Sequence, residues 1–479
     1  MTTEFDIVIG LETHIELNTK TKVFCGCINE FGGEPNTHCC PVCIGLPGVL
    51  PTVNLEAVKK AVKMGLATNS EIANEFYFDR KHYFYPDLAK AYQISQNNTP
   101  ICKNGFVEIV GDDGNEKKIR IHQIHLEEDA GKLIHSNTGE TFVDYNRGGV
   151  PLIEIVSEPD MSSTTEALNY VTYIKDLVKH IGVSDCKMEQ GQLRCDVNVS
   201  LKPRGSKTLG TKVEMKNINS FKAIERAINF EVNRQLTKIK MGEKIEAETR
   251  RWDDATNQSF QMRSKEGAKD YRFMPEPDIP LTILSEKQIK GIKDSMPLLP
   301  KQIKAKLVGE YGLNEYDASQ IAKDSEVINF FFETAKYYTD YKKISNWINS
   351  EINKKLNLEV LESTKIPLNP KEFASLLAHV DKGDISQAGS RKLLVELWEN
   401  PNKKTEELID ELGLRLNQND DELEEIIKSI ISNNPKAVAD YKAGKNVFAF
   451  FIGQVMKATK GQADAGKVNK IVAELLKNC

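Results

Sequence analysis

Apolar and polar residues alternate along several short segments within the first 293 residues of the chain. Alternation with a period of two is typical of β-strands, because successive side chains point to opposite faces of a sheet. The pattern therefore predicts strands in six segments: FDIVIGL, FVEIV, KKIRIHQIHL, VPLIEIV, RCDVNVSL and TKVEMKNI. The apolar neighbours in VPLIEIV indicate a strand that is covered on both faces.

Two stretches of the same region repeat their apolar residues at helical spacing: LEAVKKAVKMGLAT and TTEALNYVTYIKDLVKHIG. The second follows SEPDMSS and carries an acid in its first turn. Serine, threonine and acidic residues favour a helix N-terminus because they accept hydrogen bonds from its free N–H groups. Strands and helices mixed in this way predict an α+β fold for residues 1–293.

From about residue 294 the strand patterns stop, and amphipathic helical segments follow, separated by Pro, Gly and Asn. We predict a helical domain over 294–408 and a small helical tail domain over 409–479. The charge changes sign near this second boundary. Residues 405–428 carry nine acids against Arg415 and Lys428, whereas residues 435–479 carry eight lysines against three acids, a net charge of 8 − 3 = +5.

Length and composition exclude several classes of protein. A chain of 479 residues has the size of two to four domains, and 40% hydrophobic with 28% charged residues is typical of a globular protein rather than a disordered one. No segment reaches the roughly 18 apolar residues that a membrane helix needs, and the first residues lack a targeting pattern. We therefore expect a cytoplasmic protein with no membrane partner. The net charge of −5 requires any nucleic acid to be met by a local basic patch.

Five of the nine cysteines lie between residues 25 and 43, in the segments CGC and HCCPVC. Four thiolates on two short turns are the donors of a tetrahedral structural zinc site, for which we predict Cys25, Cys27, Cys40 and Cys43. Cys39 or His38 could replace one of them. Buried thiols without a metal and a reactive redox pair are the alternatives, and a closed four-cysteine site would not itself reveal the function.

Acidic residues and one histidine gather in three segments of the predicted sheet. The row in GLETHIEL contains Glu12, His14 and Glu16 on one face of a strand, HLEED contains Glu127, Glu128 and Asp129, and PLIEIVSEPD contains Glu154. A buried carboxylate needs a partner, and oxygen ligands with an imidazole suit Mg²⁺ or Mn²⁺ shared with nucleotide phosphates. Separate, solvated acids fit the spacing equally well.

Further polar sets are candidates for phosphate binding. The segment DAGK lacks the glycine and the hydroxyl residue of a phosphate-binding P-loop, so that motif is excluded. NRGGVP offers Arg147 and two glycines whose amides could bind an anion, although an ordinary tight turn fits it too. Alternation also places Asp196 on one strand face, and Lys212, Glu214 and Lys216 on another. An open, solvated sheet face would explain these two sets equally well.

Many motifs of the chain occur together, and in the same order, in one known family. They are GLETHIEL, the CxC and CPVC pairs, FGGEPN, GLPGVLP, DRKHYFYPDLAKAYQISQ, HLEEDAGK, NRGGVPLIEIVSEPD, GQLRCDVNVS, KVEMKNINSF, DYRFMPEPDIP and GQVMKATKGQADAGKVNKIV. The chain closely resembles, over its whole length, the B subunits of bacterial-type aspartyl/glutamyl-tRNA amidotransferases. The resemblance implies a cradle-like catalytic domain with a mixed or antiparallel sheet, followed by the helical and tail domains.

The resemblance also implies a reaction. The B subunit uses ATP to phosphorylate the side-chain carboxylate of Glu-tRNA(Gln) or Asp-tRNA(Asn), and ammonia then converts the acyl phosphate to the amide. The ammonia comes from a separate amidase subunit, and a small third subunit completes a heterotrimer. The chain itself contains no Ser-Ser-Lys amidase signature and no Cys-His glutaminase arrangement, in agreement with an external source of ammonia.

Carried over residue by residue, the resemblance implies that His14, Glu127 and Glu154 bind Mg²⁺. Glu12 and Glu128 lie beside them in the sequence motifs, and one of the two could take the proton that ammonia loses. We assign Arg147, Lys212, Asp196 and Glu214 as candidates for contacts with ATP. In the family members that keep these cysteines the element is a structural zinc site, whereas some members lack it, and Cys39 departs from the single cysteine that usually precedes PVC.

The tail domain carries Lys457, Lys460, Lys467 and Lys470 at spacings that put several of them on one helical face. Such a face is ordinarily just solvated, but the resemblance implies that the helical and tail domains bind tRNA. Two other functions remain open at this point: a non-catalytic, zinc-containing scaffold that binds tRNA, and a metal-dependent ligase that works without an amidase partner.

Overall fold

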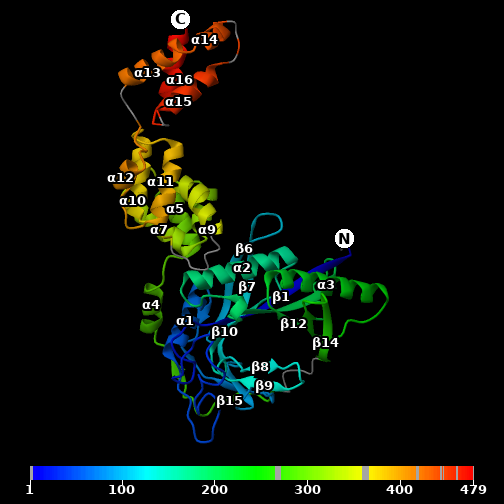
Figure 1. Cartoon of the computed structure of the whole chain (residues 1–479). Helices are drawn as coiled ribbons and strands as arrows, with labels where there is room; N and C mark the ends of the chain where they lie inside the picture. The colour runs from blue at the N-terminus through cyan, green and yellow to red at the C-terminus, as the bar shows by residue number, and fades with distance from the viewer. Residues whose placement is uncertain are drawn as a thin grey trace. The chain divides into compact units, whose positions relative to one another are not determined.

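The computed structural model describes residues 4–264, 271–358, 366–416, 420–442, 445, 447–459 and 462–477. The chain divides into two compact units, Met1–Leu299 and Pro300–Cys479 (Figure 1). Every strand named in the described residues belongs to the first unit, and the second unit is helical. The prediction of an α+β fold followed by a helical region is therefore confirmed.

A nine-stranded mixed sheet is the framework of the first unit. Only β12 and β13 run parallel; the other neighbouring pairs in the sheet are antiparallel. In spatial order the strands are β14 (Gln258–Ser264), β13 (Glu248–Asp253), β12 (Val213–Ile218), β11 (Leu193–Pro203), β1 (Phe5–Glu16), β10 (Pro151–Ser157), β7 (Glu116–Glu128), β6 (Cys102–Val110) and β2 (Glu71–Ile72). All six predicted strands lie in this sheet.

Shorter strands form three small sheets in the same unit. They are β15 (Met274–Pro275) with β4 (Asp79–His82) and β5 (Tyr92–Ser95), β16 (Thr282–Ile283) with β3 (Glu75–Phe76), and β8 (Lys132–His135) with β9 (Thr141–Asp144). A hydrogen bond from Ile94 N to Glu128 Oε1 of 2.9 Å connects β5 to the end of β7. This contact joins the small three-stranded sheet to the end of β7.

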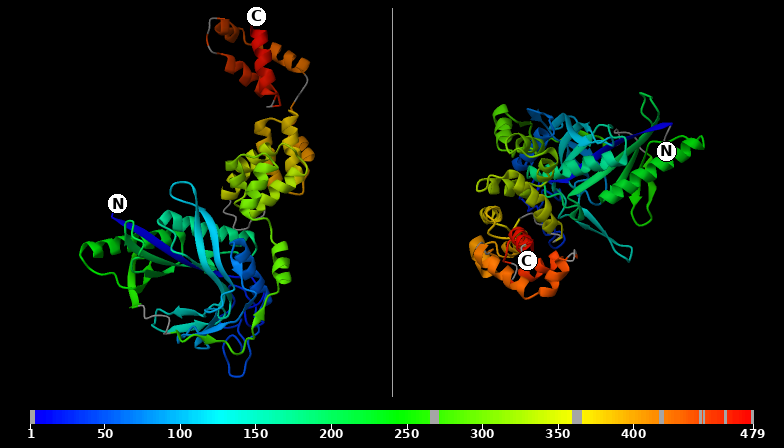
Figure 2. Two further views of the ribbon diagram at one scale, coloured as in Figure 1. Left: turned by 180° about the vertical axis from the view of Figure 1, so that it is seen from behind. Right: turned by 90° about the horizontal axis from the view of Figure 1, so that it is seen from above.

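Helices cover one face of the large sheet. The helices of this unit are α1 (Leu55–Ala67), α2 (Thr164–His180), α3 (Phe221–Lys240) and α4 (Glu286–Asp294), with a short 3₁₀ turn at Met188–Gln190. α1 packs on β6 and β7, α2 on β1 and β6, and α3 on β11 and β12 (Figure 2). Each strand turns alternate residues toward these helices, so Leu11, Ile155 and Val197 are fully buried in one continuous core. The opposite face of these strands carries the polar residues Glu12, Glu154 and Asp196.

The sequence pattern predicted α1 and α2 but not α3, the longest helix in the described part of the chain. Its apolar positions are interrupted by charged residues, and two of the buried positions are polar. Glu231 is fully buried and pairs with Arg234 at 2.8 Å, while Gln235 donates a hydrogen bond of 3.1 Å to Val199 O on β11. Polar anchors of this kind weaken the periodic signal although the segment lies against the sheet.

The second unit consists of short helices. They are α5 (Pro300–Gly309), α6 (Glu315–Ile321), α7 (Ser325–Ala335), α8 (Tyr341–Trp347), a π-helical turn (Ile348–Ile352), α9 (Asn353–Leu358), α10 (Pro370–Asp381), α11 (Gln387–Glu399), α12 (Thr405–Glu411), α13 (Asp420–Ser432), α14 (Pro435–Lys442), α15 (Phe448–Ala458) and α16 (Ala465–Lys477). Asn or Asp caps several of them, for example Asn314 before α6, Asp324 before α7 and Asn369 before α10.

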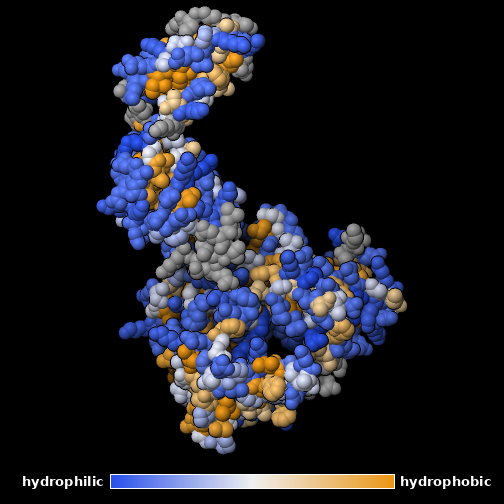
Figure 3. All heavy atoms as spheres, viewed as in Figure 1, coloured by the Kyte–Doolittle hydropathy of each residue, from blue (hydrophilic) through white to orange (hydrophobic). Residues whose placement is uncertain are grey.

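Two hydrophobic clusters stabilise the second unit. One contains buried residues between Ile303 and Ile409, the other between Leu423 and Leu476. Figure 3 shows a mostly hydrophilic surface over these helices, as amphipathic helices around a core require. The division of this unit at residue 408 stays a prediction. Among the described residues, no helix combines the length and the apolar character that crossing a membrane requires.

The start of α2 allows a direct test of the fold. Glu166 is 4% exposed and its carboxylate accepts hydrogen bonds from Ser162 N at 2.7 Å and from Lys117 Nζ of β7 at 2.7 Å. Burial raises the pKa of Glu166, but Lys117 and Ser162 outweigh it and lower the pKa below its ordinary value. We expect Glu166→Gln to reduce the free energy of unfolding at pH 7 by about 1–3 kcal/mol.

The effect should depend on pH in one direction. Because the folded-state pKa of Glu166 is depressed, the carboxylate stabilises the fold above about pH 4.5, and this stabilisation is lost as the pH falls through the folded pKa. Urea unfolding should therefore show a constant difference between the two proteins from pH 7 to about pH 4.5, and convergence as the pH is lowered further through the folded pKa. Glu56→Gln removes an exposed pair with Lys59 in the first turn of α1 and should change the stability by less than about 1 kcal/mol. A constant difference across the pH range would contradict the assignment.

Candidate functional site

Cross-strand registers assemble a polar site on the open face of the large sheet. His14 of β1 lies opposite Arg194 of β11 on one side and Glu154 of β10 on the other, and Glu154 lies opposite His125 of β7. Neighbouring strands are roughly 5 Å apart, so these four side chains form one row across the sheet. Residues two positions away on each strand extend the same face.

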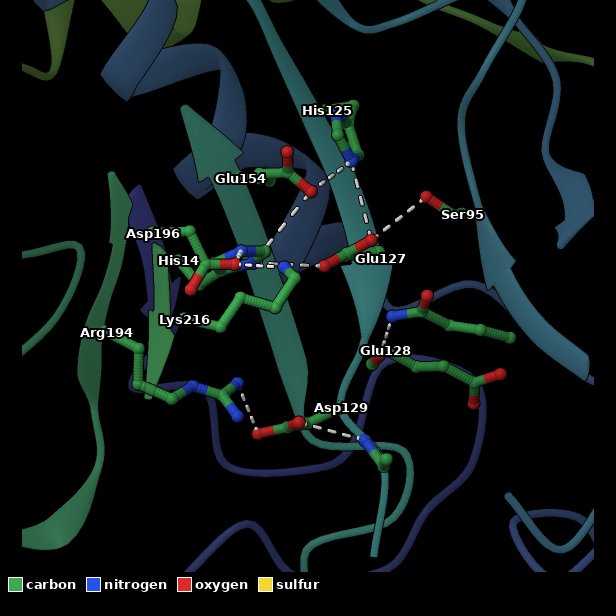
Figure 4. A network of polar contacts seen from close by, with 12 residues as sticks. His14, Ser95, His125, Glu127, Glu128, Asp129, Glu154, Arg194, Asp196 and Lys216 are labelled. Carbon is green, nitrogen blue, oxygen red and sulfur yellow. Dashed lines mark hydrogen bonds and ion pairs between the residues drawn. The ribbon is translucent and has the colours of Figure 1, made fainter. Parts of the chain in front are cut away.

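The first group of donors consists of His14, Glu127 and Glu154 (Figure 4). His14 Nδ1 lies 3.4 Å from Glu127 Oε1 and 3.9 Å from Glu154 Oε2. Each of the three residues offers a donor atom, and these atoms all lie within 4.8 Å of one another. The structure thus brings together three residues that are far apart in the sequence, and their donors fit a divalent cation that prefers oxygen and imidazole ligands.

A second histidine, His125, contacts the same two carboxylates. Its Nε2 lies 3.2 Å from Glu154 Oε2 and 3.4 Å from Glu127 Oε2. Ser95 of β5 donates a further hydrogen bond of 3.0 Å to Glu127 Oε2. Figure 4 shows Glu127 between Ser95 and the histidines. Neither His125 nor Ser95 was identified from the sequence; His125 could have been found, because it lies two positions before Glu127 on one strand.

Charge balance sets the protonation of this group. Burial lowers the pKa of both histidines. The neighbouring carboxylates, with Glu154 foremost, have the larger and opposite effect: they raise the pKa of His14 above its ordinary value and the pKa of His125 to about 10. Burial raises the pKa of Glu154, and His125 and His14 outweigh it and lower the pKa to about 2; the pKa of Glu127 is likewise lowered. A cation that binds here therefore competes with protons on the imidazole rings.

A second group of carboxylates lies beside the first. Glu12, Asp196 and Glu214 also offer oxygen atoms within 4.8 Å of one another, and Asp196 Oδ2 is 3.9 Å from His14 Nε2. The Lys216 ammonium contacts Asp196 and lies 3.0 Å from Glu214 Oε1. Asp196 and Glu214 were candidates for ATP contacts from the sequence, and Lys216, which alternation places on the same strand face as Glu214, is the positive charge between them.

Glu12 has a different electrostatic environment from Glu127. Burial raises its pKa, and the nearby carboxylates of Glu154 and Glu214 raise it further, whereas Lys216 and a hydrogen bond of 2.9 Å from Asn198 Nδ2 act in the opposite direction. The net pKa lies above the ordinary value. Such a carboxylate takes up a proton more readily than a solvated one, which is the property required of a general base.

Glu16 and Asp129 continue the polar face beyond His14. Burial and the Asp129 carboxylate raise the pKa of Glu16 to about 8. Arg194 Nη2 donates a hydrogen bond of 2.8 Å to Asp129 Oδ2. Arg147 donates to Ala130 O at 2.9 Å and to Gly131 O at 2.8 Å, so its guanidinium secures the turn after β7. Lys212 lies exposed just before β12, outside the donor groups.

Glu128 faces away from the first donor group. Its carboxylate pairs with Lys90 and accepts the backbone N–H of Ile94. A cavity of about 190 Å³ adjoins this pair, lined also by Cys43, Leu46 and Asp278. The structure thus separates Glu127 from Glu128, as alternation on a strand requires. Lys90 was not identified from the sequence.

The cysteine element gathers four sulfurs. Cys25, Cys27, Cys40 and Cys43 offer Sγ atoms that all lie within 4.8 Å of one another. The thiol of Cys39 instead lies 3.7 Å from Asn146 Oδ1, and the backbone N–H of His38 donates a hydrogen bond of 2.8 Å to the same oxygen. Four sulfurs at this spacing could hold one metal ion.

One of these sulfurs is favoured as a thiolate. Hydrogen bonding from Cys25, together with the backbone of Cys40 and the charge of Lys22, lowers the pKa of the Cys43 thiol to about 4. Lys22 is fully buried, with its Nζ 3.7 Å from Cys43 Sγ and 3.2 Å from Tyr145 O. A thiolate is the form that binds metal. Lys22 was not identified from the sequence.

Comparison of the sequence with known proteins places this chain in a family. A model described as the GatB/GatE catalytic domain matches residues 7–290, and one described as the GatB domain matches residues 329–476. The B subunit of an aspartyl/glutamyl-tRNA(Asn/Gln) amidotransferase from Thermoanaerobacter sp. (strain X514) is 49% identical over 474 residues, covering 99% of both chains. The B subunits of the same enzyme from Caldicellulosiruptor saccharolyticus (48% over 478 residues, 99% of both) and Clostridium acetobutylicum (47% over 474 residues, 99% of both) are similarly close.

Proposed function

Since the chain belongs to the GatB/GatE family, we propose that it acts as the B subunit of a tRNA-dependent amidotransferase. Its reaction is the ATP-dependent conversion of Glu-tRNA(Gln), Asp-tRNA(Asn), or both, to the corresponding amides. The single observation that carries the proposal is the group of His14, Glu127 and Glu154 on the sheet face, within the part of the chain that the catalytic-domain model matches.

The first step transfers the γ-phosphoryl group of ATP to the side-chain carboxylate of the aminoacyl-tRNA. One carboxylate oxygen attacks phosphorus, ADP leaves, and an acyl phosphate forms. A carboxylate is already a nucleophile, so the protein needs to position the two substrates and to balance negative charge. We assign His14, Glu127 and Glu154 to hold Mg²⁺, which when bound supplies positive charge at the phosphate oxygens. Lys216, beside Asp196 and Glu214, adds a protein charge at the same face.

The second step forms the amide. Ammonia attacks the acyl carbon, the C–N bond forms, phosphate leaves, and the nitrogen loses a proton. Glu12 fits the acceptor of that proton, because its pKa is raised and its carboxylate lies on the same face as the first donor group. Glu128, paired with Lys90, fits this role less well. We further assign Asp196, Glu214, Arg147 and Lys212 as candidate ATP contacts, of which Arg147 supports the turn that follows β7.

The proposal includes partners and a location. A separate amidase subunit supplies the ammonia, and a small third subunit completes the heterotrimer. The description of the relatives as B subunits agrees with such an assembly. The substrate is a misacylated tRNA, and we propose a cytoplasmic location, where aminoacyl-tRNA is made and used. The three-domain division at residues 293 and 408, with tRNA binding by the tail domain, is part of the same proposal.

Removing a proposed ligand tests the function. In the complex reconstituted with its amidase and small subunits, Glu127→Gln should lower amide formation on Glu-tRNA(Gln) by roughly 10²- to 10³-fold, the range for loss of a charge-stabilising group. ATP hydrolysis that depends on the misacylated tRNA should fall with it. Glu71→Gln, at an exposed carboxylate of the edge strand β2 bonded to Asn104, should leave both rates unchanged. Binding of tRNA without such ATP hydrolysis in the unaltered complex would favour the non-catalytic scaffold instead.

We propose Zn²⁺ as the metal of the cysteine element, because four sulfurs within 4.8 Å of one another suit an ion that prefers four cysteine ligands. Cys43→Ser should reduce bound zinc from about one ion per chain to a small fraction, with a lower melting temperature, because a three-sulfur site binds more weakly. Cys39→Ser should keep its zinc, since that thiol faces Asn146. Elemental analysis of the purified chains measures both. Equal zinc loss in the two variants would mean that Cys39 is a ligand.

The tail helices offer a test of tRNA binding. Lys457 on α15 and Lys467 and Lys470 on α16 are exposed; Lys460 lies outside the described residues. Reversing all three charges to Glu should weaken tRNA binding and reduce the dependence of log K on log salt by about one unit per lost phosphate contact. Lys428→Glu on α13, next to Glu424, is the matched control. Unchanged salt dependence in the triple variant would exclude these lysines from the tRNA interface.

A further inference from the structure

His125 is a buried histidine that the proposed reaction does not use. It is 6% exposed and lies on β7, two residues before Glu127 and directly opposite Glu154 of β10. The first donor group, whose ligand atoms lie within 4.8 Å of one another, consists of His14, Glu127 and Glu154. His125 contacts two of these three residues from the side opposite His14 (Figure 4).

The contacts of His125 show which ring nitrogen faces the carboxylates. Nδ1 faces Gln123, whose Nε2 lies 3.4 Å away. Nε2 then points at the carboxylates, 3.2 Å from Glu154 Oε2 and 3.4 Å from Glu127 Oε2. One N–H group therefore lies between two carboxylate oxygens that would otherwise repel each other.

The same contacts decide which oxygen of Glu127 faces His14. Ser95 Oγ donates to Glu127 Oε2 at 3.0 Å, and His125 Nε2 lies near the same oxygen. The other oxygen, Oε1, is the one that lies 3.4 Å from His14 Nδ1. Ser95 and His125 thus orient the carboxylate so that Oε1 points toward the donor group. A hydrogen bond from a second residue to a ligand carboxylate usually raises metal affinity by fixing the ligand's orientation.

We propose that His125 is a positioning residue, which holds the Glu127 and Glu154 carboxylates in the orientation that binds the divalent cation. This inference rests on the proposed function. His125 in this role neither reacts nor binds the cation, but it determines the affinity of the site for the cation. An apolar side chain of the same size would leave the two carboxylates without a donor between them, and an amide placed where Nε2 lies would restore it.

The test measures Mn²⁺ affinity by electron paramagnetic resonance on the full-length chain, without nucleotide or tRNA. His125→Phe should weaken Mn²⁺ binding about 10- to 100-fold. His125→Gln should recover most of the loss, because the glutamine amide nitrogen lies where Nε2 was. His125→Asn should remain weak, because its amide nitrogen corresponds to Nδ1. His122→Phe, at an exposed histidine of β7 paired with Glu158, should leave the affinity unchanged.

The three substitutions at residue 125 also separate positioning from a general loss of folding. If the Phe variant does not fold, the Gln and Asn variants are compared, since both are polar and differ in where the donor lies. Equal affinities in these two would overturn the proposal. In the complete complex, the Mg²⁺ concentration for half-maximal ATP turnover should rise in the Asn variant, and saturating Mg²⁺ should restore the rate. A purely structural defect would not be corrected by the cation.

One further variant keeps this inference distinct from the proposed function. His14→Ala removes a proposed ligand itself and should weaken Mn²⁺ binding more than any change at His125. If His14→Ala leaves the affinity unchanged, the cation site of the proposed function is wrong. If His14→Ala weakens binding but His125→Phe and His125→Asn do not, only the positioning role is overturned.

Discussion

The balance of charge on one face of the large sheet is the constraint on which the site depends. Burying an unpaired carboxylate costs several kcal/mol, and this face carries Glu12, Glu127, Glu154, Asp129, Asp196 and Glu214 within a few strands of one another. The structure meets this cost with cations from neighbouring strands, namely His14, His125, Arg194 and Lys216. A divalent cation that binds here would take over part of the neutralising role of these side chains, and it competes with protons on the imidazole rings.

The register of the strands determines where these charged side chains lie. The other face of the same strands is apolar and covered by α1, α2 and α3, so a shift of one residue would carry the acids into the core and the core residues into water. The apolar face therefore specifies the pairing, and the pairing places Glu154 between His14 and His125. The hydrophobic core and the polar site are in this sense two consequences of one alternation.

Alternation is also what made much of the sheet predictable. It identified the six strands and the rows of side chains in GLETHIEL and RCDVNVS, because period two is a local property. Pairing between strands that are distant in the sequence is not local, so the contact of His14 with Glu127 could not be read from spacing, and His125 was overlooked. Helix α3 was not predicted, because buried polar residues such as Glu231 interrupt its pattern of apolar positions. The four cysteines were evident from clustering, whereas the direction of the Cys39 thiol depends on the backbone of one turn.

The cysteine element shows how a closed metal site can matter to chemistry that it does not touch. Its loop donates hydrogen bonds from Asn36 N to Asp144 Oδ1 at 3.0 Å and from His38 N to Asn146 Oδ1 at 2.8 Å, which secures the turn before β10. The same turn bonds the end of β7, through Gly149 N to Asp129 O at 2.9 Å. A metal held by four sulfurs would stiffen this path, because the unfolded chain has no preformed site and the binding free energy stabilises the fold. The element and Arg147 thus support the segment from which Glu127 and Asp129 reach the polar face, and they do so through hydrogen bonds between side chains and backbone rather than through reactive groups.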